Sequence, residues 1–133
     1  MTNLKPSDIC GSWKLESFEI ESPEKQLSPW GRDAHGLLIY ANTGHMSVSI
    51  NKAIEKDPDQ SDEQNLFDSI LFYSGTYQLD GDIIRHQVTN ASNPSRIGKE
   101  MIRYAEFKGD LMTLVTPQES FGRAILKWRK LKQ

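Results

Sequence analysis

Turn signals recur at short intervals along the chain, between runs of residues in which apolar and polar side chains alternate. The clearest signal is Asp80-Gly81, which separates residues 72–79 from residues 83–89 and is a residue pair favoured by type I′ hairpin turns. Further turns are expected at residues 42–44 and around residues 108–110. Turns spaced this closely favour a meander of antiparallel strands over a layered α/β fold.

The alternation of side chains predicts eight strands. They cover residues 12–21, 37–41, 46–51, 72–79, 83–89, 101–107, 111–116 and 124–131. The apolar positions change parity between Leu15 and Phe18, so a bulge or bend is expected near Ser17. The predicted fold class is all-β, an eight-stranded antiparallel up-and-down barrel, in which each strand can have one buried and one solvated face.

One helix is expected over residues 61–72, between the third and fourth predicted strands. Ser61 and Gln64 have the spacing of a capping box. Apolar residues then recur at helical spacing, at Leu66, Phe67, Ile70 and Leu71. A single helix cannot bury such a stripe by itself, so we expect it to pack on the sheet or to plug one end of the barrel.

Length and composition predict a single domain over residues 1–133. The net charge of −2 provides no basic excess for binding nucleic acid. Cys10 is the only cysteine, which excludes an intrachain disulfide. Because no apolar run resembles a signal peptide or a membrane helix, we expect a cytoplasmic protein without membrane association. The oligomeric state is left open.

The predicted Asp80-Gly81 hairpin suggests a polar-tipped pocket. Its register would place Gly75 opposite His86, with Tyr73 and Tyr77 as diagonal neighbours on the same face. A glycine would open space beside one imidazole and two phenols, which suits a ligand pocket. The alternative is that Gly75 only bends the strand and that His86 is a hydrogen-bonded core residue.

Arg103, Tyr40 and Trp30 complete the candidate site. Arg103 shares a strand face with apolar residues, at positions 105 and 107 and, on the next strand, 112 and 114. That face can point inward or outward, and an inward guanidinium would need a carboxylate, phosphate or polar ligand group. Tyr40 is expected to face Met46 across its hairpin, and Trp30 lies in a loop that could gate the barrel mouth together with the helix.

Metal and cofactor chemistry find little support in the sequence. His35 and His45 fall on one predicted hairpin about 20 Å apart at ~3.3 Å per residue, too far to share an ion with each other. Sequence motifs for zinc binding, for nucleotide phosphates and for a serine nucleophile are also missing. We therefore expect neither a metal nor a cofactor.

The chain resembles the calycin superfamily, and more closely the bacterial and fungal lipocalin-like domain proteins of uncertain function. The resemblance rests on Gly11-Ser12-Trp13 with Leu15 and Ser17, residues 36–40, 44–46 and 73–77, His86, Asn93-Pro94, Gly98, Arg103 and Trp128-Arg129. It implies that Trp13 closes one end of the barrel and packs against a basic residue of the last strand. Arg129 is the expected partner and Arg123 the weaker candidate.

Three functions fit these expectations. The first is intracellular binding of a small, mostly apolar molecule or metabolite, whose polar end is oriented by His86, Tyr73, Tyr77 and Arg103. The alternative is a cofactor-free isomerase, cyclase or dehydratase, with His86 as the acid–base group and Tyr73 or Arg103 stabilising negative charge. The third is a filled barrel that acts as an interaction module.

Overall fold

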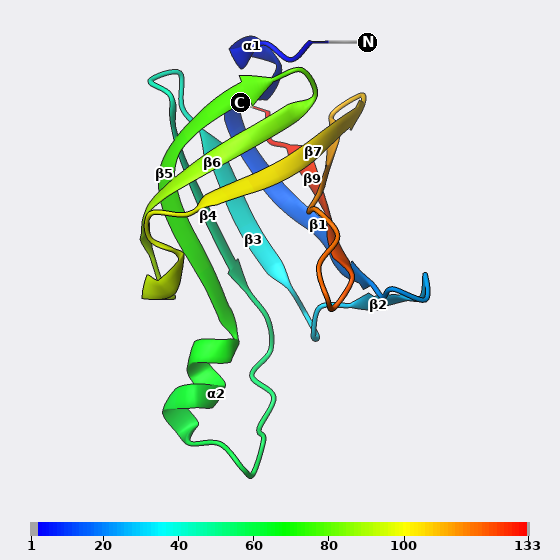
Figure 1. Ribbon diagram of the computed structural model, residues 1–133, viewed down its shortest axis with the longest axis vertical. Coiled ribbons are helices and arrows are strands. Elements are labelled where there is room, and N and C mark those ends of the chain that lie inside the picture. Colours follow the sequence, from blue (N-terminus) through cyan, green and yellow to red (C-terminus); the bar gives the residue numbers. More distant parts are fainter. Residues whose placement is uncertain (1–2, 133) are drawn as a thin grey trace.

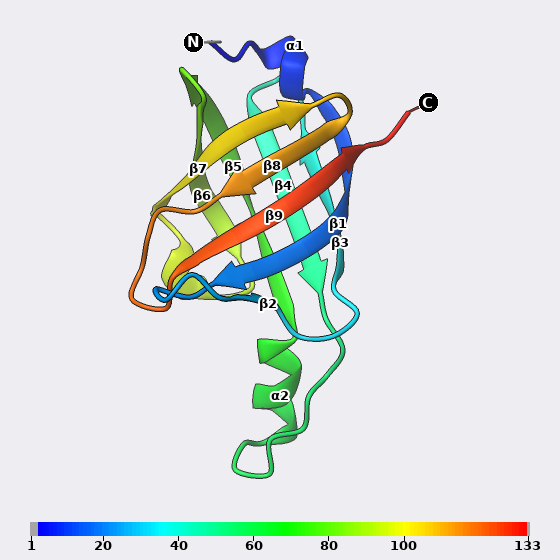
Figure 2. The same ribbon diagram turned by 90° about the vertical axis from the view of Figure 1, so that its right-hand side faces the viewer.

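A computed structural model describes residues 3–132 of the chain as one antiparallel sheet that closes on itself (Figures 1 and 2). The barrel strands are β1 (Gly11–Glu21), β3 (His35–Tyr40), β4 (His45–Asn51), β5 (Ile70–Asp80), β6 (Ile83–Ala91), β7 (Glu100–Lys108), β8 (Leu111–Val115) and β9 (Arg123–Lys130). Neighbours in the chain are neighbours in the sheet, and β1 pairs with β9 to close it. The predicted all-β, eight-stranded antiparallel barrel is therefore confirmed.

A short ninth strand, β2 (Leu27–Pro29), pairs with the far end of β1 and was not predicted. Its three residues are exposed, so they carry no alternating pattern that could reveal a strand. β1 itself shifts register between Leu15 and Ser17, as the change of parity predicted. The bulge lets both Leu15 and Phe18 face the barrel interior, where each is buried.

The β3–β4 and β5–β6 hairpins both form as predicted, but the β5–β6 hairpin has a different register. Tyr40 pairs with Met46 as predicted. In the β5–β6 hairpin Asp80 pairs with Ile83, so the two-residue loop is Gly81-Asp82, and the predicted pairs of Leu79, Tyr77 and Gly75 are each displaced by two residues. Gly81 has φ 62°, which supplies the left-handed conformation that the turn requires. A displacement of two preserves the face on which each side chain lies.

Helix α2 (Asp62–Asp68) lies within the predicted residues 61–72 but is shorter than expected. Its predicted place between the third and fourth strands is not confirmed: α2 follows the fourth strand, β4, because the unpredicted β2 adds a strand before it. Ser61 caps it by accepting a hydrogen bond from the backbone N–H of Gln64. Residues 70 and 71 belong to β5, so the expected apolar stripe shrinks to Leu66 and Phe67, which are 48% and 42% exposed. The helix projects from the barrel and neither packs on the sheet nor plugs it (Figures 1 and 2).

The opposite end of the barrel is closed by the short helix α1 (Pro6–Ile9) and by Trp13. The Trp13 indole N–H donates to the Ile9 carbonyl at 2.9 Å. The cation over its ring is Lys130, whose Nζ lies 5.2 Å from the ring centroid. The predicted partners are wrong: Arg129 binds Glu16 and Arg123 binds Glu21. Strand alternation explains this, because the inward face of β9 carries residues 128 and 130.

No helix within residues 3–132 is long and apolar enough to cross a membrane. The remaining helical segment is the 3-10 turn η1 (Pro94–Arg96), which connects β6 to β7. Asn93 caps this turn by accepting a hydrogen bond from the backbone N–H of Ser95. The cap fixes the turn at the barrel wall, and its last residue, Arg96, reaches the cavity described below.

Candidate functional site

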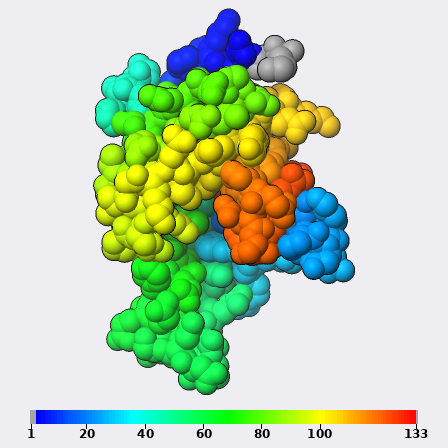
Figure 3. All heavy atoms as spheres, in the orientation of Figure 1, coloured from blue at the N-terminus to red at the C-terminus, as the bar shows by residue number. Residues whose placement is uncertain are grey.

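The barrel holds a cavity of about 640 Å³ at the end away from Trp13. In the space-filling view a hollow lies between the yellow and orange segments of the surface (Figure 3). Most of the wall is apolar and comes from inward-facing strand residues, among them Phe18, Leu38, Ile50, Leu71, Leu114 and Leu126. A cavity of this volume and lining is typical of small-molecule sites.

His86 stands at the centre of the polar part of the site. It lies on β6 and is 2% exposed. The Tyr40 hydroxyl on β3 lies 2.6 Å from its Nε2, and the Tyr73 hydroxyl on β5 lies 2.6 Å from its Nδ1. Burial, reinforced by the positive charge of Arg103, lowers the pKa of His86 to about 3. The imidazole is therefore neutral at physiological pH.

In a neutral imidazole one ring nitrogen donates and the other accepts, so the two hydrogen bonds of His86 run in opposite directions. Burial raises the pKa of Tyr40 and of Tyr73, so both phenols keep their protons. Tyr40 is 1% exposed and lies outside the cavity wall, with His86 as its hydrogen-bond partner. We infer that Tyr40 donates to Nε2 and that Nδ1–H donates to Tyr73. The hydroxyl hydrogen of Tyr73, which does line the cavity, is then free to donate to a ligand.

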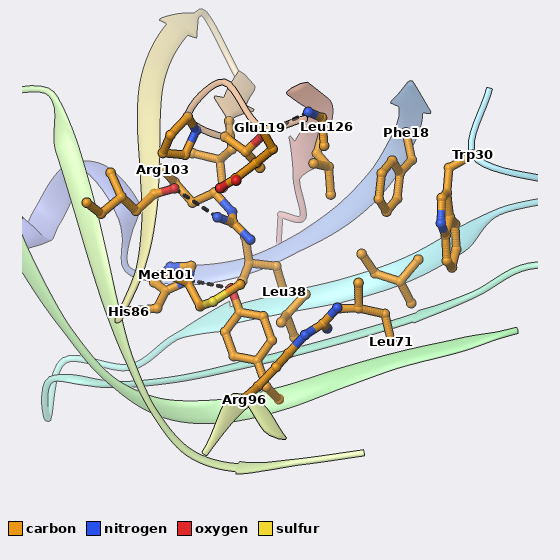
Figure 4. Close-up of a pocket in the computed structure, with 18 of the residues that line it drawn as sticks. Phe18, Trp30, Leu38, Leu71, His86, Arg96, Met101, Arg103, Glu119 and Leu126 are labelled. Carbon is orange, nitrogen blue, oxygen red and sulfur yellow. Dashed lines mark hydrogen bonds between the residues drawn. The ribbon is translucent and has the colours of Figure 1, made fainter. Parts of the chain in front are cut away.

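Two arginines reach the cavity without an acidic partner. Arg103 on β7 and Arg96 on η1 extend into it from different sides (Figure 4). Arg103 donates from Nη1 to the Ile102 carbonyl at 2.8 Å, and within residues 3–132 neither arginine forms a salt bridge. Of the carboxylates at the cavity, Glu100 is paired with Arg85, and Glu119 lies exposed in the loop after β8.

Trp30 forms part of the cavity wall, whereas helix α2 does not. The Trp30 ring stacks on Phe18, with centroids 4.6 Å apart and planes 13° apart. Lys52 Nζ lies 4.5 Å from the centroid of the same ring. The indole is thus held between an aromatic ring and a cation, which suits a fixed wall residue better than a swinging gate.

The predicted site residues divide into two groups. Tyr73, His86, Arg103 and Trp30 line the cavity, whereas Tyr40, Gly75 and Tyr77 do not. Tyr77 pairs with His86 on the neighbouring strand, and its hydroxyl donates to the Ala41 carbonyl at 2.8 Å.

Gly75 opens no space beside His86, contrary to the prediction, since it pairs with Val88 next to a register shift. A Cβ atom on Gly75 would lie 1.8 Å from the Gln87 carbonyl oxygen. The glycine is therefore required for the close approach of the β6 backbone, which is the bend considered as the alternative.

Two contributors to the site were missed, Arg96 and Trp128. Trp128 is 1% exposed and lines the cavity. Its indole Nε1 is the one buried side-chain nitrogen or oxygen without a hydrogen-bond partner in the described part of the chain. The alternation of Ala124, Leu126 and Trp128 along the last strand could have placed this indole inside. Arg96 sits in an irregular turn, where no periodic pattern indicates its direction.

We also searched residues 3–132 for side chains grouped so that they could bind a metal ion. None of residues 3–132 belongs to a group of three or more histidine, cysteine, aspartate or glutamate side chains placed to bind an ion. His35 and His45 are exposed and lie at opposite ends of the β3–β4 hairpin. Each makes a local contact, His35 with the Asp33 carbonyl and His45 with the Thr43 hydroxyl.

Comparison with known proteins agrees with the barrel. The model of the lipocalin-like domain family matches residues 10–131. The chain belongs to this family. A search of the curated proteins finds no match.

Among solved structures, the fold is similar to a redesigned β barrel, at 10% identity and a TM-score of 0.50, over 96% of this chain and 95% of that one. A mutant of the fluorescent protein UnaG is 14% identical with a TM-score of 0.48, over 97% of this chain and all of that one (100%). At an identity of 10%, the likeness to the redesigned barrel bears on the fold alone.

Proposed function

We propose that this lipocalin-like protein binds a small, mostly apolar molecule inside its barrel. The observation that carries the proposal is the cavity of about 640 Å³, which has an apolar wall and a few polar groups at one side. Burial of an apolar ligand against such a wall provides affinity, and the few polar groups provide orientation. The filled barrel considered above predicts no such cavity, so the cavity weighs against an interaction module.

The unpaired polar groups support the same proposal. A buried donor without a partner costs free energy, on the order of 1–3 kcal/mol. The Trp128 indole N–H has no partner. Arg103 bonds to the Ile102 carbonyl, and through its charge and a side-chain hydrogen bond it opposes the rise that burial causes in the pKa of Tyr73. It has no acidic partner among residues 3–132. A bound molecule with suitable acceptors would satisfy groups that the fold leaves unsatisfied.

The geometry of His86 weighs against the catalytic alternative. Both ring nitrogens are already engaged by tyrosine hydroxyls. Its pKa of about 3 leaves the imidazole neutral across the physiological range, whereas an efficient acid–base group has a pKa near the working pH. We therefore favour binding over isomerase, cyclase or dehydratase chemistry at this residue.

The binding proposal is tested by titrating the protein with N-phenyl-1-naphthylamine, a neutral apolar probe that fluoresces in apolar surroundings. Ala124→Phe fills the cavity from β9, since Ala124 lines it and is 6% exposed. The matched control is Ile125→Phe, the next residue on the same strand, which lies outside the cavity wall.

We expect saturable binding by the wild type and by Ile125→Phe, and a loss of affinity of about tenfold or more in Ala124→Phe, equivalent to at least about 1.4 kcal/mol. Urea denaturation of all three proteins shows whether each remains folded. Equal probe affinity in the two variants, or no binding by the folded wild type, would contradict the proposal.

A further inference from the structure

We propose that the ligand is an organic anion, with an apolar body and one carboxylate, and that Arg103 and Tyr73 hold the carboxylate. The inference rests on the proposed function and adds the chemical class of the ligand. It follows from three features of the polar side of the cavity: its charge, the direction of its hydrogen bonds and the kind of polar group it contains.

The charge at this side is positive. Arg103 and Arg96 both line the cavity, and within residues 3–132 neither forms a salt bridge. Of the two carboxylates at the cavity, Glu100 pairs with Arg85, with Nη1 and Oε1 2.9 Å apart, and Glu119 lies exposed in the loop after β8. A guanidinium beside an apolar wall is costly to desolvate when unpaired. A neutral ligand would exclude water from Arg103 and leave its charge unpaired, whereas a carboxylate would pair with it, in bidentate geometry if both oxygens engage.

The electrostatic influence of Arg103 reaches the tyrosines and the histidine of the site. Its positive charge lowers the pKa of Tyr73 and of Tyr40, opposing the larger rise that burial causes, and it adds to the depression of the His86 pKa. The guanidinium and the Tyr73 hydroxyl therefore belong to the same polar locus. An anionic group placed there contacts both.

The hydrogen-bond directions make this locus a set of donors. Both hydroxyls lie 2.6 Å from a ring nitrogen of His86. With the directions inferred above, in which Tyr40 donates to Nε2 and Nδ1–H donates to Tyr73, the free hydrogen of Tyr73 is directed away from His86. Arginine and the tryptophan indole have donors only. Apart from the exposed carboxylate of Glu119, the unengaged polar groups named here, including the Trp128 N–H, offer hydrogens. An ionised carboxylate is the complement of such donors, because it accepts and does not donate.

The inference is tested with a matched pair of ligands, 11-(dansylamino)undecanoic acid and its primary amide. The two share the apolar body and the fluorophore, and they differ only in the charge of the terminal group. Hydrogen bonds to charged groups are stronger than neutral ones, so we expect the acid to bind about tenfold more tightly than the amide at pH 7.

Variants identify the residue that recognises the charge. Arg103→Met is expected to abolish the preference for the acid over the amide, because it removes the charge-assisted contact that only the acid can make. Lys127→Met is the matched control: it removes one positive charge from the outward face of β9, and the preference should persist. Arg103→Lys keeps the charge without the planar fork, so it should retain part of the preference.

The outcomes separate this inference from the proposed function. Acid and amide bound with equal affinity would overturn the carboxylate assignment and leave binding in the cavity intact. The same conclusion follows if N-phenyl-1-naphthylamine binds and neither dansyl ligand does. If none of the three probes binds to folded protein, both proposals fail. If the dansyl acid binds, its displacement by dodecanoic acid or by 1-naphthaleneacetic acid distinguishes an alkyl ligand body from an aromatic one.

Discussion

Two tryptophans inside the same barrel have opposite surroundings. Trp13 and Trp128 are both 1% exposed. Trp13 donates its indole N–H to the Ile9 carbonyl, lies beneath Lys130 and packs against Phe107, with ring centroids 6.3 Å apart. Trp128 lines the cavity, and its N–H has no partner. One indole N–H is therefore hydrogen-bonded within the fold, while the other belongs to a residue of the cavity wall and is unpaired.

The contrast extends to the two ends of the barrel. At the closed end, polar atoms find partners within the chain, as in the contact between Tyr77 and the Ala41 carbonyl. At the cavity, Arg103 and Arg96 form no salt bridge, and the Trp128 N–H has no hydrogen-bond partner, among the described residues. A satisfied polar network rigidifies a core, whereas unsatisfied donors lower stability until a ligand pairs with them. We therefore assign a structural role to the closed end and propose recognition as the role of the cavity.

Truncation of the closed-end tryptophan should have the largest effect. Trp13→Ala removes a buried side chain and leaves the Ile9 carbonyl unpaired, so we expect the free energy of unfolding to fall by about 3–5 kcal/mol. Urea denaturation measures the change. The paired comparison is Trp13→Phe against Trp128→Phe. Only the former breaks a hydrogen bond, and a larger loss in Trp128→Phe would reverse the roles assigned to the two indoles.

Removal of His86 should also destabilise the protein. His86→Leu leaves the Tyr40 and Tyr73 hydroxyls buried without their partner, at an expected cost of about 2–4 kcal/mol. The triple variant Tyr40→Phe/His86→Leu/Tyr73→Phe removes both hydroxyls as well, so it should recover most of the lost stability in denaturant titrations. A triple variant as unstable as His86→Leu alone would show that packing, not hydrogen bonding, accounts for the loss.

Acidification tests the same cluster. The pKa of His86 is about 3 in the folded protein, below the ordinary value of 6.5. The unfolded chain therefore binds a proton more readily, and the stability from this residue is present above pH 6.5 and is lost as the pH falls toward 3. Between pH 7.5 and 5 we expect a loss of about 2 kcal/mol. The triple variant lacks His86 and supplies the control, because its pH dependence should be shallower by that amount.

Loss of the cation over Trp13 should have the smallest effect. Lys130→Met keeps the aliphatic part of the side chain and removes the charge, so the expected cost is about 0.5–1 kcal/mol. The measurement is a double-mutant cycle with Trp13→Leu in urea. A coupling energy of zero would mean that Lys130 covers the indole only as an apolar stem.

The sequence predicted what depends on local pattern. Alternation and turn residues indicated the hairpins, and the parity of β5 and β6 placed Tyr73 and His86 on one face despite a register error of two residues. Arg103 was correctly grouped with the positions of β7 and β8 that face inward, although its direction was left open. Such features follow from the two-residue period of a strand.

What the sequence did not reveal depends on contacts between distant strands. Tyr40 on β3 reaches His86 on β6, although the two strands are separated by β4 and β5. Only closure of the barrel brings them together, and no spacing along the chain encodes that distance. The expected role of Arg129 failed for a local reason, since Trp128 occupies the inward position and turns Arg129 outward to Glu16.

The three indole N–H groups allow the central claim to be measured directly. In a two-dimensional ¹H–¹⁵N spectrum, the signals of Trp13, Trp30 and Trp128 are assigned from single Trp→Phe variants. Addition of 11-(dansylamino)undecanoic acid should move the signals of Trp128 and Trp30, which line the cavity, and leave that of Trp13 in place. A spectrum in which Trp13 shifts while Trp128 does not, or in which no indole shifts at saturating ligand, would contradict the account.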